Sequence, residues 1–190
     1  MNLFRFVKDT LAIRKARKAL KVELKELAKK RAEYLSMTSN SLAALSDEEL
    51  FQAARMRAEH IVDSFDDMEK GFLSLNNEQR ILYALTYMEM EVANGGLCQF
   101  FVNSSRVVAP FVSDYMAIVG ADKHKELFDQ FISKHRINLQ DLTSFRIETI
   151  EDYQKQFERY PFDEYDDSFY ELPLIEASLI PFVRNHVHQF

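Results

Sequence analysis

Few side chains in this sequence stand at spacings that suit catalysis or metal binding. The five histidines are His60, His124, His135, His186 and His188. None belongs to an H-E-x-x-H pattern or to a Cys/His metal-ligand pair. His186 and His188 are two residues apart, so a helix would turn their rings to different faces. These spacings indicate no catalytic residue, no cofactor and no metal site.

Cys98 is the only cysteine, and it follows Gly95 and Gly96 closely. A nucleophilic thiol needs a positioned base, and no His or Asp lies beside this one in the sequence. Leu97 and Phe100 flank it, so we expect a small buried side chain. A lone cysteine suits a reducing compartment, and no apolar run has the length of a signal peptide or a membrane span. We therefore expect a cytoplasmic protein.

Aromatic residues follow the two adjacent glycines within segment 91–105, which reads E-V-A-N-G-G-L-C-Q-F-F-V-N-S-S. We expect Gly95 and Gly96 to end a helix, because glycine readily adopts the left-handed backbone found at helix ends. Phe100 and Phe101 are expected to fill the core, since buried aromatic rings cover large areas. The segment is therefore predicted to join two helices at the centre of the fold.

The polar members of segment 91–105 have two alternative roles. As structural groups, they would bond to the backbone around the glycines or across to the chain and cap the next helix. As functional groups, they would line the pocket of a small-ligand-binding protein or an enzyme. The residues concerned are Glu91, Asn94, Gln99 and Asn103, with Ser104 as a further capping candidate. The structural role is favoured, and the pocket is kept as the alternative.

Charge is unevenly divided along the chain, whose formal net charge is −6. Residues 1–34 hold 11 Lys or Arg and 4 acids, a net charge of +7. Residues 141–176 hold 11 acids and 3 basic residues, a net charge of −8. Such an asymmetry is typical of proteins with interaction surfaces of opposite sign.

The acidic stretch has an ordinary and a sharper interpretation. Acids usually form a solvated face, but carboxylates on a rigid helical surface can also imitate the phosphate array of duplex DNA. A surface of this kind would bind a basic protein, with interleaved Tyr and Phe adding apolar contacts. The acids that we assign to it are Glu151, Asp152, Glu158, Asp163, Glu164, Asp166, Asp167 and Glu171.

Apolar residues recur at helical spacing along most of the sequence, and Gly and Pro number only 4 each. We predict an all-α fold, a compact multi-helix domain over 45–190 preceded by a long basic N-terminal helix over 1–36. Ser46 with Glu49, and more weakly Thr149 with Asp152, have the spacing of capping boxes. The helices expected in the domain span 47–66, 78–93, 107–119, 123–135, 149–159 and 173–188.

Some segments between these helices are harder to assign from the sequence. Residues 37–46 are rich in Ser, Thr and Asn and are expected to form a linker. Gly71 is expected to break the helical pattern. Residues 137–149 are less periodic, and a short strand is an open alternative there.

The basic N-terminal helix carries Leu20, Leu24 and Leu27 on one face. We expect this stripe to pack on the body or on a second copy of the chain, because docked helices with mixed charges are common. Contact of residues 1–34 with a membrane surface or RNA is the less favoured alternative.

Segment 91–105 resembles the signature E-x-x-N-G-G-F-x-Q-F-F-x-N-S-S-G of a bacterial DNA-mimic protein family. Leu97 stands where the signature has Phe, and Arg106 stands where it has Gly. Residues 163–170, 183–185 and Phe190 resemble the C-terminal part of that family. The resemblance covers roughly residues 45–190.

This resemblance implies an all-helical, often dimeric protein that binds a transcription factor in place of DNA. We therefore expect a non-enzymatic interaction or regulatory protein whose acidic surface binds a basic partner, such as a DNA-binding regulator. Direct DNA binding by the main domain is not expected, and a homodimer remains open.

Overall fold

The computed structural model describes residues 3–190, with side chains from residue 15 onward. Ten α-helices and three short 3-10 helices make up this range, which contains no strand, so the all-α prediction is confirmed. The α-helices are α1 (Leu3–Ser36), α2 (Ser39–Ala43), α3 (Asp47–Asp63), α4 (Met68–Ser74), α5 (Asn77–Val102), α6 (Ala109–Val119), α7 (Asp122–His135), α8 (Ile150–Arg159), α9 (Phe162–Tyr170) and α10 (Glu176–Asn185). The 3-10 helices are η1 (Ser104–Val108), η2 (Thr143–Phe145) and η3 (Val187–Gln189).

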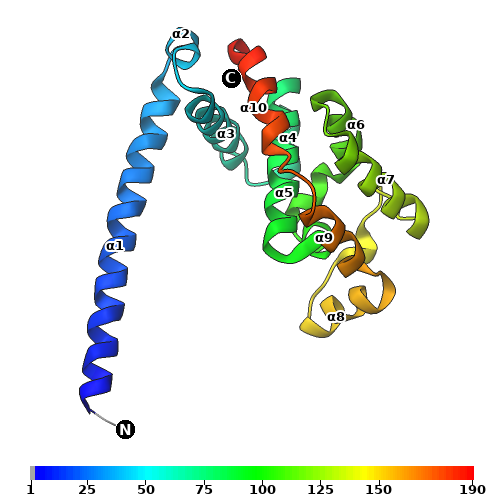
Figure 1. Ribbon diagram of the computed structural model, residues 1–190, viewed down its shortest axis with the longest axis horizontal. Helices are drawn as coiled ribbons and strands as arrows, with labels where there is room; N and C mark the ends of the chain where they lie inside the picture. Colours follow the sequence, from blue (N-terminus) through cyan, green and yellow to red (C-terminus); the bar gives the residue numbers. More distant parts are fainter. Residues whose placement is uncertain (1–2) are drawn as a thin grey trace.

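Helix α5 lies at the centre of the body, where it contacts α3, α6, α9 and α10 (Figure 1). It is apolar on several sides, and its fully buried residues include Leu82, Leu85, Phe100 and Phe101. A helix that is apolar around most of its circumference must be surrounded by others. The position of α5 therefore follows from its composition.

Helix α1 extends from the body as a long rod (Figure 1), and its C-terminal end packs against α3. Arg31 forms an ion pair with Asp63 of α3 at 2.8 Å, and Lys30 donates to Gln52 of the same helix at 2.9 Å. None of the described helices is long and apolar enough to cross a membrane.

Local capping signals in the sequence are realised in the structure. Ser46 and Glu49 form the predicted capping box at the start of α3, and Thr149 and Asp152 form the one at the start of α8. Each box supplies acceptors to backbone N–H groups that lack partners in the first helical turn.

Four local expectations were wrong. Gly71 lies inside α4 and does not break it. Only glycine fits at this position, because a Cβ there would stand 2.8 Å from the Val62 carbonyl oxygen. The expected linker contains α2, which the Thr38 side chain caps. Residues 137–149 hold η2 and no strand. The helix expected over 47–66 ends at Asp63, and Phe65 lies beyond it and is exposed.

Candidate functional site

Helix α5 is broken at the two glycines of segment 91–105. Gly95 has φ −164° and ψ 25°, and Gly96 has φ 77° and ψ 178°, so neither is helical. The positive φ of Gly96 lies in the region that L-residues rarely adopt. The predicted interruption by Gly95 and Gly96 is therefore present, and a short buried helical stretch, 97–102, follows it.

Helix α9 supplies hydrogen-bond partners on both sides of the break. In a continuous helix the Val92 carbonyl would pair with the N–H of Gly96, and the N–H of Leu97 would pair with the carbonyl four residues earlier. Instead, the Tyr170 hydroxyl donates to the Val92 carbonyl at 2.6 Å, and the Leu97 N–H donates to the Asp166 carboxylate at 2.8 Å. Two side chains of α9 thus supply the hydrogen-bond partners that the break in α5 leaves missing.

Asp166 does not lie on the acidic surface to which the sequence analysis assigned it. It is 9% exposed, and its Oδ2 would stand 2.0 Å from a Cβ placed on Gly96. The pKa of Asp166 is raised to about 6: burial raises it most, the Leu97 N–H lowers it, and the nearby Asp163 and Asp167 raise it. The i, i+3, i+4, i+7 spacing of Phe162, Tyr165, Asp166 and Phe169 is the sequence signal that could have placed Asp166 on the buried face.

We predict that Asp166→Asn changes how stability depends on pH. The Asp166 pKa is raised from 3.8 to about 6 in the folded chain, so the folded state binds the proton more tightly than the unfolded state. The wild type therefore loses stability relative to the variant as the pH rises through the range between 3.8 and about 6. The Asn oxygen can still accept from Leu97. Urea unfolding of both proteins from pH 4 to pH 8 measures the difference, and a constant difference would refute the prediction.

Glu91 accepts three side-chain hydrogen bonds within segment 91–105. Gln99 and Asn103 donate to its Oε2 at 2.7 and 2.8 Å, and Ser105 donates to its Oε1 at 2.9 Å. Glu91 and Ser105 are buried. Three donors on one buried carboxylate fix the path of the chain from α5 into η1.

The roles of the other polar residues in the segment differ from the predictions. Asn103 and Ser104 make no side-chain cap on η1, because the Asn103 amide is engaged by Glu91 and Ser104 faces solvent. Asn94 is exposed. The Ser105 hydroxyl donates to Glu91, a bond that the sequence did not predict.

A groove of about 730 Å³ adjoins the end of this segment and is lined by Ser104, Arg106 and Arg146 among others. Its lining does not include Glu91, Gln99 or Asn103. Because Gln99 and Asn103 both donate to Glu91, the geometry favours the structural role of these three side chains over the alternative ligand pocket.

Cys98 is fully buried, as predicted. The pKa of its thiol is raised to about 12, chiefly by burial, although the hydrogen bond with Tyr153 lowers it. The thiol is therefore protonated at neutral pH, which does not suit a nucleophile.

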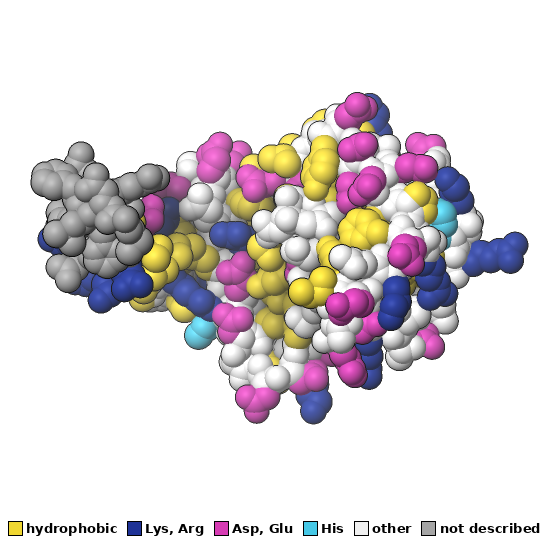
Figure 2. Space-filling model, turned by 90° about the horizontal axis from the view of Figure 1, so that it is seen from below, with side chains coloured by type: hydrophobic (Ala, Val, Ile, Leu, Met, Phe, Trp, Pro, Cys, Tyr) yellow, Lys and Arg dark blue, Asp and Glu magenta, His cyan; other side chains and the backbone are white. Residues whose placement is uncertain are grey.

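The remaining acids of the proposed surface lie on or beside α8 and α9. Asp152 is partly exposed and pairs with Lys155 at 2.9 Å. This pair, together with hydrogen bonds from Thr149 and Glu148, lowers the pKa of Asp152 to about 2. Figure 2 shows the molecule from below the view of Figure 1, with acidic side chains distributed over the body among apolar ones. Of the acids that the sequence assigned to this surface, the exposed ones are Glu151, Glu158, Asp163, Glu164, Asp167 and Glu171.

Comparison with known proteins identifies the family of the body. No curated protein and no solved structure matches the sequence significantly. The family model described as DMP19-like protein matches residues 73–186, a range that runs from the end of α4 through α10. This range contains segment 91–105 and both helices that carry the exposed acids. Because the match covers more than half of the 190 residues, the chain belongs to the DMP19-like protein family.

Proposed function

We propose that this protein is a non-enzymatic DNA mimic that binds a DNA-binding protein through the exposed acids of α8 and α9. Membership of the DMP19-like family, in which DNA mimicry is the suggested function, is the observation that carries the proposal. A partner that normally binds DNA in the cell would meet this protein in the cytoplasm, which is where we place it.

The chemistry of α8 and α9 suits a basic partner. DNA-binding proteins place Lys and Arg against phosphates, and exposed carboxylates on two adjacent helices offer the same charge. Phe157 and Tyr170 are large exposed aromatic residues on these helices and would add apolar contacts. The bonds from Asp166 and Tyr170 to α5 hold α9 in place, so its acids need little ordering on binding.

Neutralising the acidic surface is expected to abolish partner binding at physiological salt. The immobilised chain is first used to capture and identify a DNA-binding protein from its source cell, and the purified protein is then titrated. The surface variant is Glu151→Gln, Glu158→Gln, Asp163→Asn, Glu164→Gln, Asp167→Asn and Glu171→Gln. We expect its affinity to fall at least about 100-fold, since each lost charge contact contributes to a steep salt dependence.

A charge-matched control distinguishes the effect of this specific surface on partner binding from the effect of net charge. It neutralises six exposed acids outside α8 and α9, namely Glu48→Gln, Asp66→Asn, Glu69→Gln, Asp114→Asn, Asp122→Asn and Glu126→Gln. We expect this control to bind almost as well as the wild type, and duplex DNA to displace both. Equal losses in the two variants, or no displacement by DNA, would contradict the proposal.

A further inference from the structure

An exposed apolar groove lies at the start of α8. It has a volume of about 420 Å³ and is lined by Ile147, Glu148, Thr149, Ile150 and Tyr153. Ile150 is 75% exposed, the largest exposed fraction among the large apolar side chains that the structure describes. Helix α8 lies at the lower end of the body in Figure 1, and Figure 2, seen from below, shows apolar side chains among acidic ones at this end.

The groove continues along α8 onto a second exposed ring. The centroids of the Tyr153 and Phe157 rings are 5.4 Å apart, and Phe157 is 38% exposed. Ile150, Tyr153 and Phe157 are three and four residues apart, so they share one face of the helix. Together with Ile147 these three side chains form what we call the α8 groove. A contiguous apolar surface of this kind marks a place where another molecule binds.

Contacts beneath α8 hold the groove in shape. The Tyr153 hydroxyl is hydrogen-bonded to the buried thiol of Cys98 on α5, and Gln156 donates to the Ser144 carbonyl at 3.0 Å. The capping box described above fixes the first turn of the helix. Because the groove is formed before anything binds to it, little ordering has to accompany binding.

Acidic side chains surround the groove. Glu148 belongs to its lining, Glu151 and Glu158 stand beside its apolar residues, and all three are exposed. The groove lies within stretch 141–176, whose net charge is −8, so an anionic membrane or a nucleic acid would be repelled. An apolar centre inside a polar rim is the usual anatomy of a protein interface. The complementary surface carries apolar side chains flanked by Lys or Arg.

We infer that the α8 groove binds an amphipathic, Lys- or Arg-rich helix of the DNA-binding partner. The inference rests on the proposed function and names the segment of the partner that would be bound. A helix satisfies its own backbone hydrogen bonds and presents apolar residues every three or four positions. An extended segment would need a strand edge for its backbone, and residues 3–190 form no strand.

The groove gives this protein a contact that phosphates do not offer. Charge contacts to carboxylates, like those to phosphates, weaken as the salt concentration rises. Burial of apolar side chains releases no counterions and is not weakened in this way. The exposed acids therefore set how steeply partner affinity falls with salt, and the groove adds affinity at every salt concentration.

Titration of the full chain with a synthetic peptide tests the inference without any DNA-binding protein. The peptide carries leucine at helical spacing and lysine elsewhere, and its control has the same composition in scrambled order. We expect the amphipathic peptide to bind the wild type about tenfold more tightly than the scrambled one, since only the former aligns its leucines with the groove. Ile150→Leu is expected to keep this advantage, and Ile150→Ser to remove it.

Ile150→Asp separates apolar from electrostatic binding, because it adds a carboxylate to the acidic surface. A purely electrostatic contact would make this variant bind the lysine-rich peptide more tightly than the wild type does. We expect weaker binding instead, because the apolar contact is lost. Aspartate favours the first turn of a helix, so α8 should persist, and circular dichroism verifies it.

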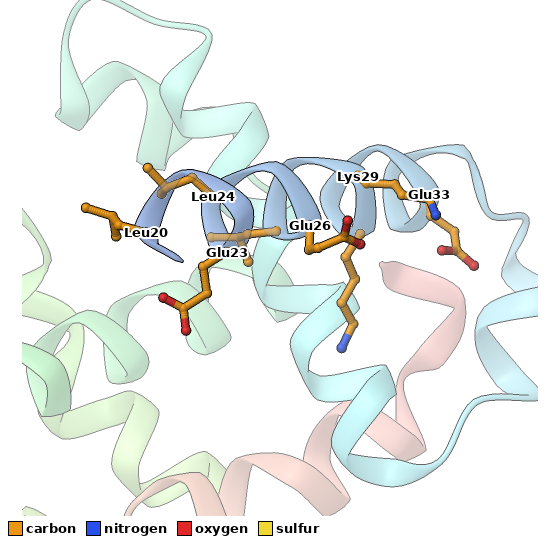
Figure 3. Close-up of a pocket in the computed structure, with 8 residues that line it drawn as sticks. Leu20, Glu23, Leu24, Glu26, Lys29 and Glu33 are labelled. Carbon is orange, nitrogen blue, oxygen red and sulfur yellow. The ribbon is translucent and has the colours of Figure 1, made fainter. Parts of the chain in front are cut away.

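Leu24→Asp on α1 is the matched control. Leu24 is 55% exposed and lines a separate groove, in which Figure 3 shows it next to Leu20. Helices α1 and α8 lie far apart in the molecule (Figure 1). Residues 1–34 carry a net charge of +7, so a lysine-rich peptide is repelled there. We expect this variant to bind the peptide like the wild type.

The captured DNA-binding partner extends the test. We expect Ile150→Ser to lower its affinity about tenfold at each point from about 50 to about 200 mM salt, with an unchanged salt slope. Ile150 variants that bind peptide and partner like the wild type would overturn the inference and leave DNA mimicry intact if the six-acid variant still loses the partner. Tighter peptide binding by Ile150→Asp, or self-association that this variant abolishes, would overturn it as well. A partner that duplex DNA does not displace would contradict the proposed function instead.

Discussion

Glu91→Ala is expected to lower the free energy of unfolding by about 2–4 kcal/mol. The substitution removes the acceptor for Gln99, Asn103 and Ser105 at once. Asn103 is exposed and can turn to water, but Ser105 is 1% exposed and cannot. The loss therefore reflects buried donors left without partners. Urea titration at neutral pH measures it as a shifted midpoint with unchanged slope.

Two further variants sharpen this prediction. Glu91→Gln keeps the shape, and the Ser105 hydroxyl can rotate to accept from the new amide, so we expect a smaller loss of about 1–2 kcal/mol. Asn94→Ala, at an exposed position of the same segment, should change stability by less than about 0.5 kcal/mol. If Glu91→Ala were as mild as Asn94→Ala, the carboxylate would not be the structural centre that we describe.

Gly96→Ala is expected to cost about 3–5 kcal/mol or to prevent folding. Two effects combine at this position. Gly96 has a φ of 77°, which strains any residue with a Cβ, and that Cβ would stand 2.0 Å from Asp166 Oδ2. Asp166 would have to move and abandon the Leu97 N–H. The melting temperature measured by circular dichroism reports the loss.

Gly120 offers a control for a positive φ alone, because its ψ is 25°, in the left-handed helical region, whereas the ψ of Gly96 is 178°. Its φ is 76°, almost the same as that of Gly96, but nothing lies within 4 Å of a Cβ added there. We expect Gly120→Ala to cost only about 1 kcal/mol. In Gly96→Ala/Asp166→Ala the clash is removed, so the double variant should lose less than the sum of its single variants. Equal effects of Gly96→Ala and Gly120→Ala would show that the contact with Asp166 does not matter.

These contacts connect segment 91–105 at the centre of the fold to the proposed binding surface. The Gly96 position accepts Asp166 of α9, and the same helix presents Asp163, Glu164 and Asp167 to solvent. The buried Gly96 therefore helps to position part of the acidic surface without belonging to it. Variants of Gly96 that still fold should consequently weaken partner binding, because α9 would lose its anchor.

The sequence by itself determined the features that depend on near neighbours along the chain. The helical class, the capping boxes at Ser46 and Thr149 and the break at Gly96 were all predicted. Each depends on interactions within about four residues, which is the reach of a helical turn. The burial of Cys98 was predicted too, because its neighbours are apolar and no base lies beside it.

Only the tertiary structure decided which polar groups meet across long separations. Asp166 bonds to Leu97, 69 residues away, and the Glu89 carboxylate accepts the N–H of Ile175 at 2.5 Å, 86 residues away. A list of acids cannot separate Asp166 from Asp167, since both are charged and adjacent. Packing separates them, because α9 turns one toward the break in α5 and the other toward solvent. Charge and periodicity are local properties, whereas a hydrogen-bond partner depends on how the helices assemble.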